Sequence, residues 1–117
     1  MTARTPAQRR SIAMALPPLP DADATTIGRF LDAIWAENGL AQPTLDSYRR
    51  DLELLARYRS VRKGGLVDAD RAALFDYLAW RSKEGYSPRS NARLLSALRA
   101  FYAWQVRRGA RGDDPTA

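Results

Sequence analysis

Two helix starts in this chain combine hydroxyl side chains with arginines, a pairing that suits phosphate binding. The residues fall in two groups: Thr44, Ser47 and Arg50, then Ser87, Arg89, Ser90 and Arg93. The amides and the dipole at a helix start favour an anion, and a guanidinium can bind phosphate or the O6 and N7 atoms of guanine. We therefore take these seven residues as the candidate nucleic-acid contacts. Thr44 and Ser87 also suit N-caps, and capping does not exclude a phosphate contact.

The net positive charge is concentrated in the two segments that begin at these helix starts. The chain carries 19 Lys and Arg against 13 Asp and Glu, a net charge of +6. Residues 87–111 hold six arginines and no acidic residue, and residues 44–63 hold six basic against three acidic residues. A sorted excess of this kind indicates a surface that docks onto a polyanion, and nucleic acid is the commonest one. The alternative is a cationic helix face that is only solvated.

The residue types argue against catalysis. The chain has no Cys and no His, which removes thiolate metal ligands, disulfides and the usual general base. Asp113 and Asp114 lie in a polar tail, and Asp68 and Asp70 suit turn and cap positions. No spacing indicates a metal pair, a nucleophile with its base or a phosphate-binding glycine loop. We predict no catalytic residue, no metal, no cofactor and no enzyme activity.

Four segments carry the apolar period of a helix, and none carries a strand pattern. The first runs from about 26 to 38, the second starts at Thr44, the third covers about 70–84 and the fourth 87–108. Thr25 or Thr26 suits the first N-cap, and Asp70 the third. Pro88 follows the Ser87 cap at the first helical position. The fold class predicted from these patterns is all-α.

The two ends of the chain lack this period. Pro17, Pro18 and Pro20 interrupt any helix near the start, so residues 1–24 are predicted to be a flexible arm. Residues 25–111 then form one helical domain, and residues 112–117 begin a linker. Nothing resembles a signal peptide or a membrane span, so a cytoplasmic protein is expected.

The aromatic residues are predicted to be core rather than base-stacking platforms. Phe30, Trp35, Tyr48, Phe101 and Tyr102 fall on the apolar stripes of their helices. Trp104 is different, because a helical wheel puts it at the border of the cationic side of the fourth helix. We expect Trp104 to be incompletely buried and to contact another domain or subunit.

Three segments together resemble a known family. They are TLDSYRRDLELLARY, EGYSPRSNARLLSALRAFYAWQVRRG and the closing DDPTA. At this spacing they resemble the amino-terminal core-binding domain of tyrosine recombinases, in particular the bacterial Xer type, over about residues 24–117. The resemblance implies a SAM-like, four-helix orthogonal bundle that caps one face of a recombination site. It also implies that the second and fourth helices meet the major groove, with Thr44, Ser47 and Arg50 at one helix start and Arg89, Ser90 and Arg93 at the other.

The resemblance also implies what this chain does not do. The family cleaves DNA with a tyrosine nucleophile in a carboxy-terminal domain, and none of the five tyrosines here lies in that context. We expect an excised, non-catalytic fragment of a recombinase that integrates or recombines DNA and resolves chromosome dimers before cell division. Its implied partners are a double-stranded half-site and, in the full-length protein, other recombinase subunits. The isolated domain is expected to be monomeric and to bind no membrane.

Two alternatives stay open at this point. Phage-type integrases share the same module, so the parent of this domain is either of Xer type or an integrase. The other alternative is a helical protein-interaction module whose basic face meets an acidic partner. Salt-dependent binding of duplex DNA distinguishes that module from a DNA-binding domain.

Overall fold

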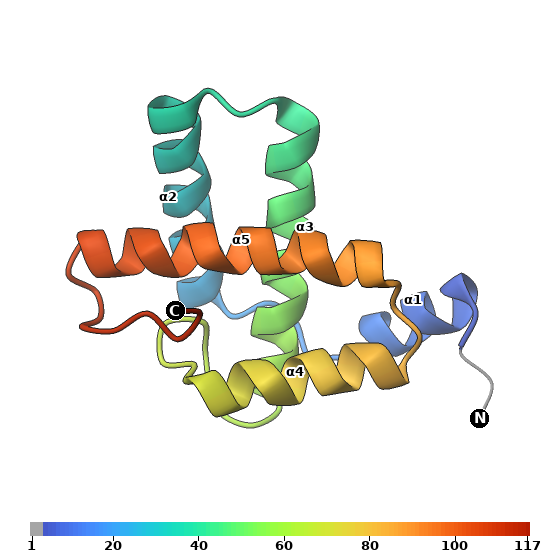
Figure 1. Ribbon diagram of the computed structural model, residues 1–117. Helices are drawn as coiled ribbons and strands as arrows, with labels where there is room; N and C mark the ends of the chain where they lie inside the picture. The colour runs from blue at the N-terminus through green and yellow to red at the C-terminus, as the bar shows by residue number, and fades with distance from the viewer. Residues whose placement is uncertain (1–3) are drawn as a thin grey trace.

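The computed structural model describes residues 4–117, which form five helices and no strand. They run in the order α1 (Pro6–Met14), α2 (Asp21–Asn38), α3 (Gln42–Ser60), α4 (Arg71–Lys83) and α5 (Pro88–Arg107). Figure 1 shows α2 and α3 as an antiparallel hairpin, α5 lying across both, and α4 running beside α5. The predicted all-α class is confirmed, and the four expected helices correspond to α2–α5.

α2 begins earlier than its expected start at Thr26. Pro20 holds the extended N-cap conformation, and Asp21 and Asp23 put negative charge in the first turn, where the helix dipole favours it. Thr26, one of the two expected caps, lies inside the helix and donates its hydroxyl to the carbonyl of Ala22 at 3.0 Å. The predicted end is confirmed, because Gly39 takes the left-handed conformation, with φ of 60°.

α3 also begins before its predicted cap. The N-cap is Ala41, and Thr44 lies in the first turn with its amide bonded to the carbonyl of Ala41 at 3.0 Å. Pro43 is the cause, since its fixed φ suits the first turn and it has no N–H to satisfy there. The prediction that Thr44 is an N-cap is therefore wrong, and its hydroxyl is not used for capping.

The starts of α4 and α5 are confirmed. The Asp70 carboxylate accepts the amide of Ala73 at 2.8 Å, and the Ser87 hydroxyl oxygen accepts the amide of Ser90 at 3.1 Å. Each cap satisfies a donor that the helix leaves without an internal partner. These caps fix where α4 and α5 start, and the start of α5 carries four of the candidate contacts.

The core lies where α5 crosses α2 and α3. Phe30 of α2 meets Phe101 of α5 edge to face, with ring centroids 5.3 Å apart, and both side chains are fully buried. Fully burying an apolar side chain of this size contributes about 1.5–3 kcal/mol. The remaining large apolar side chains that are buried are Ile27, Leu31, Ile34, Leu45, Leu52, Leu55, Tyr58, Leu66, Leu74, Tyr77, Leu94, Leu98, Tyr102 and Trp104.

Two tryptophans occupy positions opposite to those expected. Trp104 is only 8% exposed and packs at 5.6 Å from the ring of Phe30, so the expected incomplete burial is wrong. The guanidinium of Arg108 covers the Trp104 ring at 4.5 Å, which hides its edge from solvent. Trp35 is 62% exposed although it was expected in the core.

Part of the expected N-terminal arm is helical and docked. α1 starts with a capping box formed by Thr5 and Gln8. Arg57 of α3 binds the end of α1 and the segment after it, with its guanidinium donating to the carbonyls of Ala13 at 2.7 Å and Pro17 at 2.8 Å. The flexibility expected for residues 1–24 stays a prediction. Residues 1–3, which belong to this expected arm, lie outside the described residues.

The C-terminal residues fold back on the bundle between α4 and α5 (Figure 1). Arg111 donates to the carbonyls of Val67 at 3.0 Å and Ala69 at 2.7 Å, and Pro115 is buried. The segment expected to begin a linker is thus packed against the domain. None of the helices among residues 4–117 has the length and hydropathy of a membrane-spanning segment.

Candidate nucleic-acid interface

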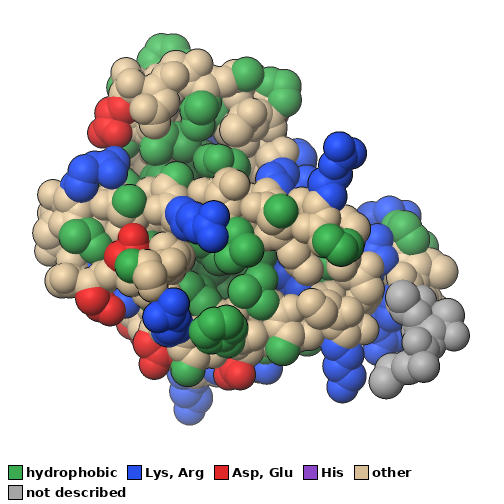
Figure 2. Space-filling view, in the orientation of Figure 1, with side chains coloured by type: hydrophobic (Ala, Val, Ile, Leu, Met, Phe, Trp, Pro, Cys, Tyr) green, Lys and Arg blue, Asp and Glu red, His purple; other side chains and the backbone are tan. Residues whose placement is uncertain are grey.

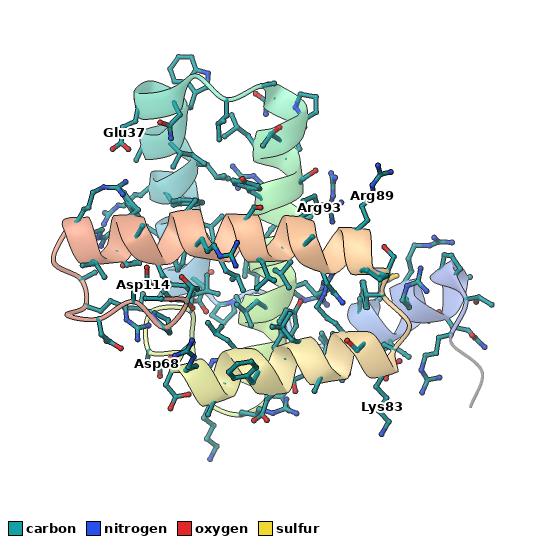
Figure 3. All side chains as sticks on the ribbon, in the orientation of Figure 1. Glu37, Asp68, Lys83, Arg89, Arg93 and Asp114 are labelled. Carbon is teal, nitrogen blue, oxygen red and sulfur yellow. The ribbon has the colours of Figure 1, made fainter. Side chains whose placement is uncertain are left out.

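A shallow cleft lies where the first half of α3 meets α5. We call it the α3–α5 cleft, and its lining residues are Pro43, Thr44, Ser47, Tyr48, Arg93 and Ser96. Figure 3 shows Arg89 and Arg93 projecting from the first half of α5 toward the side on which the start of α3 stands. The crossing of the two helices therefore brings residues of both predicted groups to one place.

Arg93 is held at the cleft by Asp51 of α3. Its Nε donates to Asp51 Oδ2 and its Nη2 to Asp51 Oδ1, each at 3.1 Å. The Asp51 side chain is 5% exposed and that of Arg93 45% exposed. The hydrogen bonds to Asp51 raise the pKa of Arg93 further, so the guanidinium stays charged. Arg93 therefore braces α3 to α5 and still presents part of its guanidinium to solvent.

Arg50 and Arg89 are exposed cations that lie within one turn of the cleft-lining residues Ser47 and Arg93. Arg50 donates to the hydroxyl of Ser47 at 3.3 Å. The side chain of Arg89 has no hydrogen-bond or ion-pair partner within residues 4–117. Figure 2 shows Lys and Arg side chains gathered beside the N-terminal end of α5. An anion bound here would meet positive charge from both helices.

The helix starts offer fewer free amides than the sequence suggested. In α5, Pro88 has no N–H, the amide of Ser90 is bonded to Ser87 Oγ, and the amide of Asn91 is bonded to the carbonyl of Ser87 at 3.0 Å. Only the amide of Arg89 remains in this turn. Side-chain hydroxyls and guanidinium groups, rather than a row of amides, are the donors available to a phosphate.

Ser90 is tied to a residue that sequence reasoning missed. Arg81 of α4 donates to Ser90 Oγ at 2.9 Å and to Asn91 Oδ1 at 2.7 Å. Arg81 follows Tyr77 and Leu78 at helical spacing, so a charged residue on an apolar stripe was the available signal. Tyr48 was assigned to the core, but it is half-buried and lines the cleft.

The predicted cationic face of α5 is less uniform than its sequence. Arg107 pairs with Glu37 at 3.2 Å, Arg111 binds backbone carbonyls, and Arg108 covers the Trp104 ring. In the other basic segment, Arg57 and Arg59 also bond to backbone carbonyls. The cations left for a ligand are concentrated at the N-terminal half of α5 and the start of α3.

The described residues include no cluster of acidic side chains that could hold a metal ion. Burial raises the pKa of both Tyr77 and Tyr102, which disfavours a nucleophilic phenolate. The Tyr102 hydroxyl donates to the carbonyl of Leu66 at 2.7 Å. The geometry at the cleft suits binding of an anionic ligand.

The comparisons with known proteins agree with this architecture. The family model described as phage integrase, N-terminal SAM-like domain, matches residues 27–109. Tyrosine recombinase XerD of Xanthomonas campestris pv. campestris is 62% identical over 117 residues, which are 100% of this chain and 36% of that protein. XerD of Xanthomonas axonopodis pv. citri is 67% identical over 96 residues, 82% of this chain and 32% of the relative. XerD of Pseudomonas aeruginosa is 47% identical over 90 residues, 77% and 30% of the two chains. The chain thus spans about a third of the length of these curated relatives.

Proposed function

Because the chain belongs to the phage integrase N-terminal SAM-like domain family, we propose that it is the DNA-binding, core-binding domain of a XerD-type tyrosine recombinase. The predicted resemblance is confirmed at the level of the family. The matched region is the non-catalytic N-terminal domain, in agreement with the prediction that this chain is not an enzyme. Site-specific strand exchange, with its role in chromosome dimer resolution, belongs to the longer protein.

The α3–α5 cleft is the observation that carries this proposal. Thr44, Ser47 and Arg93 line this cleft, and the exposed Arg50 donates to the Ser47 hydroxyl. Arg89, also exposed, lies one turn before Arg93 and projects to the same side of α5 (Figure 3). Duplex DNA offers phosphates along its backbone and guanine acceptors in its major groove. We assign Arg50, Thr44 and Ser47 to phosphate contacts. We assign Arg89 and Arg93 to base contacts, and Ser87 remains mainly a cap.

Binding by this domain alone is expected to be weak. A recombinase that holds DNA between two linked domains gains effective concentration from the linkage, and one domain forfeits that gain. The functional unit is the longer recombinase acting in the cytoplasm on a half-site, together with partner subunits. High identity to proteins named XerD favours this parent over a phage-type integrase.

The test is fluorescence anisotropy of a labelled half-site duplex over a series of salt concentrations. Affinity should fall steeply with salt, and Arg50→Ala should lower the slope of log affinity against log salt by roughly 0.9, because it loses one phosphate contact. Lys83→Ala is the matched control, because it removes the same charge from a side chain that points away from the cleft (Figure 3). The proposal would be refuted if the two variants changed duplex affinity equally. It would also be refuted if the chain bound acidic proteins but not duplex.

A further inference from the structure

Arg81 is a fully buried cation without a carboxylate partner. Its residue is 1% exposed, and its guanidinium contacts four neutral groups. The contacts are Asn91 Oδ1 at 2.7 Å, Ser90 Oγ at 2.9 Å, the Tyr77 hydroxyl at 3.4 Å and the Tyr86 ring centroid at 4.0 Å. Charges this deeply buried are usually paired with an opposite charge, because transfer out of water is otherwise unfavourable.

The acidic residues near this site are paired elsewhere. Glu84, one turn after Arg81, forms an ion pair with Arg4, and Asp51 pairs with Arg93. None of the ion pairs within residues 4–117 includes Arg81. Where Arg81 meets the first turn of α5, its guanidinium therefore contacts only neutral groups.

Ser90 lies between this buried charge and the surface. Its amide is used by Ser87 Oγ, and its hydroxyl oxygen accepts from Arg81 Nη2. Because a guanidinium has only donors, the Ser90 hydroxyl proton must point away from Arg81. A hydroxyl that accepts from a cation is polarised and becomes a stronger donor. A phosphate bound to this proton would lie about 5–6 Å from Arg81, two hydrogen-bond lengths away.

We propose that Arg81 is a positioning residue for duplex binding, orienting the Ser90 hydroxyl toward a DNA phosphate and placing positive charge behind it. The inference rests on the proposed function and assigns to a residue of α4, outside the cleft, a part in the recognition of DNA. The competing interpretation is that Arg81 only tethers the end of α4 to the start of α5. A tether would affect stability, but it would not act through Ser90.

A double-mutant cycle distinguishes the two interpretations. Arg81→Lys, Ser90→Ala and the double variant are compared in the 117-residue chain for melting temperature and for half-site affinity. Arg81→Lys and Ser90→Ala should each weaken duplex binding by about tenfold at low salt, the value of a charge-assisted hydrogen bond. The double variant should bind no worse than the weaker single variant. Additive losses would overturn the proposal.

Asn91→Ala is the matched control within the same cluster. It removes another acceptor of Arg81 but leaves the contact with Ser90. It should lower the melting temperature while duplex affinity stays within about twofold of the parent, because no phosphate contact is lost. A loss of affinity equal to that of Ser90→Ala would mean that Arg81 is only a tether.

Ser90→Asp and Ser90→Asn keep the test decisive if Arg81→Lys does not fold. The aspartate supplies a carboxylate partner for Arg81, so Ser90→Asp should melt at a higher temperature than Ser90→Asn. Ser90→Asp should nevertheless bind duplex at least about tenfold more weakly than Ser90→Asn. Equal melting temperatures would show that the charge of Arg81 is already compensated, and would overturn the proposal. If the parent chain itself does not bind duplex, the proposed function fails, and the melting comparison still reports on Arg81.

Discussion

Arg93 and Asp51 join α5 to α3 through two parallel hydrogen bonds of 3.1 Å. The pair is bidentate, with one guanidinium edge facing both carboxylate oxygens, and such pairs fix orientation as well as contributing energy. Asp51 is buried, so its carboxylate depends on Arg93 for a partner. Arg93 therefore has a structural role in addition to the DNA contact predicted from its position on the helix.

Arg93→Ala should lower the free energy of unfolding by about 1–3 kcal/mol, because it leaves a buried carboxylate unsatisfied. Arg89→Ala is the control, since Arg89 is exposed, and should change stability by no more than about 0.5 kcal/mol. Urea denaturation of the two variants measures the difference. Equal stabilities would contradict the bracing role and would mean that Arg93, like Arg89, contributes little to folding.

Arg93→Lys should relax base specificity. Lysine keeps the charge but cannot reproduce the fork that contacts Asp51 and a guanine together. We expect a loss of about 1–3 kcal/mol of discrimination at one base pair. Competition with duplexes substituted one base pair at a time measures this loss. Arg50→Lys, at an assigned phosphate contact, should leave the base preferences unchanged, and an identical shift in both variants would remove the distinction between the two arginines.

Trp104→Ala should destabilise the domain by about 3–5 kcal/mol, the range for truncating a buried large aromatic. The Trp104 side chain packs against Phe30 and Phe101, which are themselves fully buried. Trp35→Ala is the control, because Trp35 is 62% exposed and its truncation opens little cavity. Thermal or urea unfolding should separate the two variants clearly, whereas similar losses would place Trp104 outside the core.

Asp23 and Asp68 should give opposite dependences of stability on pH. Burial raises the pKa of Asp23, although the amide of Leu66 opposes this, so the folded state disfavours its charged form. Stability is then lost as pH rises from the ordinary aspartate value of about 3.9 through the raised pKa. Asp23→Asn should match or exceed the parent in stability at pH 7, and its advantage should shrink as the pH falls below the raised value.

For Asp68, burial alone would raise the pKa, but the amide of Gly65 and the guanidinium of Arg59 together lower it. Its stabilisation is present above the ordinary pKa and is lost as pH falls through the lowered value. Asp68→Asn should therefore be less stable than the parent at pH 7, with the difference closing in acid. Urea midpoints measured from about pH 3 to 7, a range that includes the ordinary aspartate pKa, would show the two variants changing in the same direction if these assignments were wrong.

Local signals in the sequence predicted the helices well. Ser87 with Pro88, and Asp70 before its helix, are caps whose partners lie three residues away, so the sequence contains the whole interaction. Thr44 was assigned as a cap by the same reasoning, but Pro43 allowed the helix to start earlier. Local sequence preference alone did not decide whether α3 starts after Ala41 or after Thr44.

The long-range contacts of charged and aromatic residues were beyond prediction from one sequence. Arg57 and Arg111 bond to carbonyls at least 40 residues away, and Arg93 meets Asp51 across 42 residues. A helical wheel gives the face of a residue but not its neighbour, which is why Trp104 was placed at the surface and Trp35 in the core. The grouping of Thr44, Ser47 and Arg93 was predicted because the family resemblance brings the second and fourth helices to one groove, and the charge count indicated the same two segments.

Backbone amide chemical-shift mapping with a half-site duplex tests the central claim most directly. The account predicts that duplex shifts the amides around residues 43–50 and 87–96, which border the α3–α5 cleft, while those around Lys83 on α4 stay in place. Shifts confined to the outer face of α4 or to the α2 surface around Trp35, with none at the cleft, would contradict it.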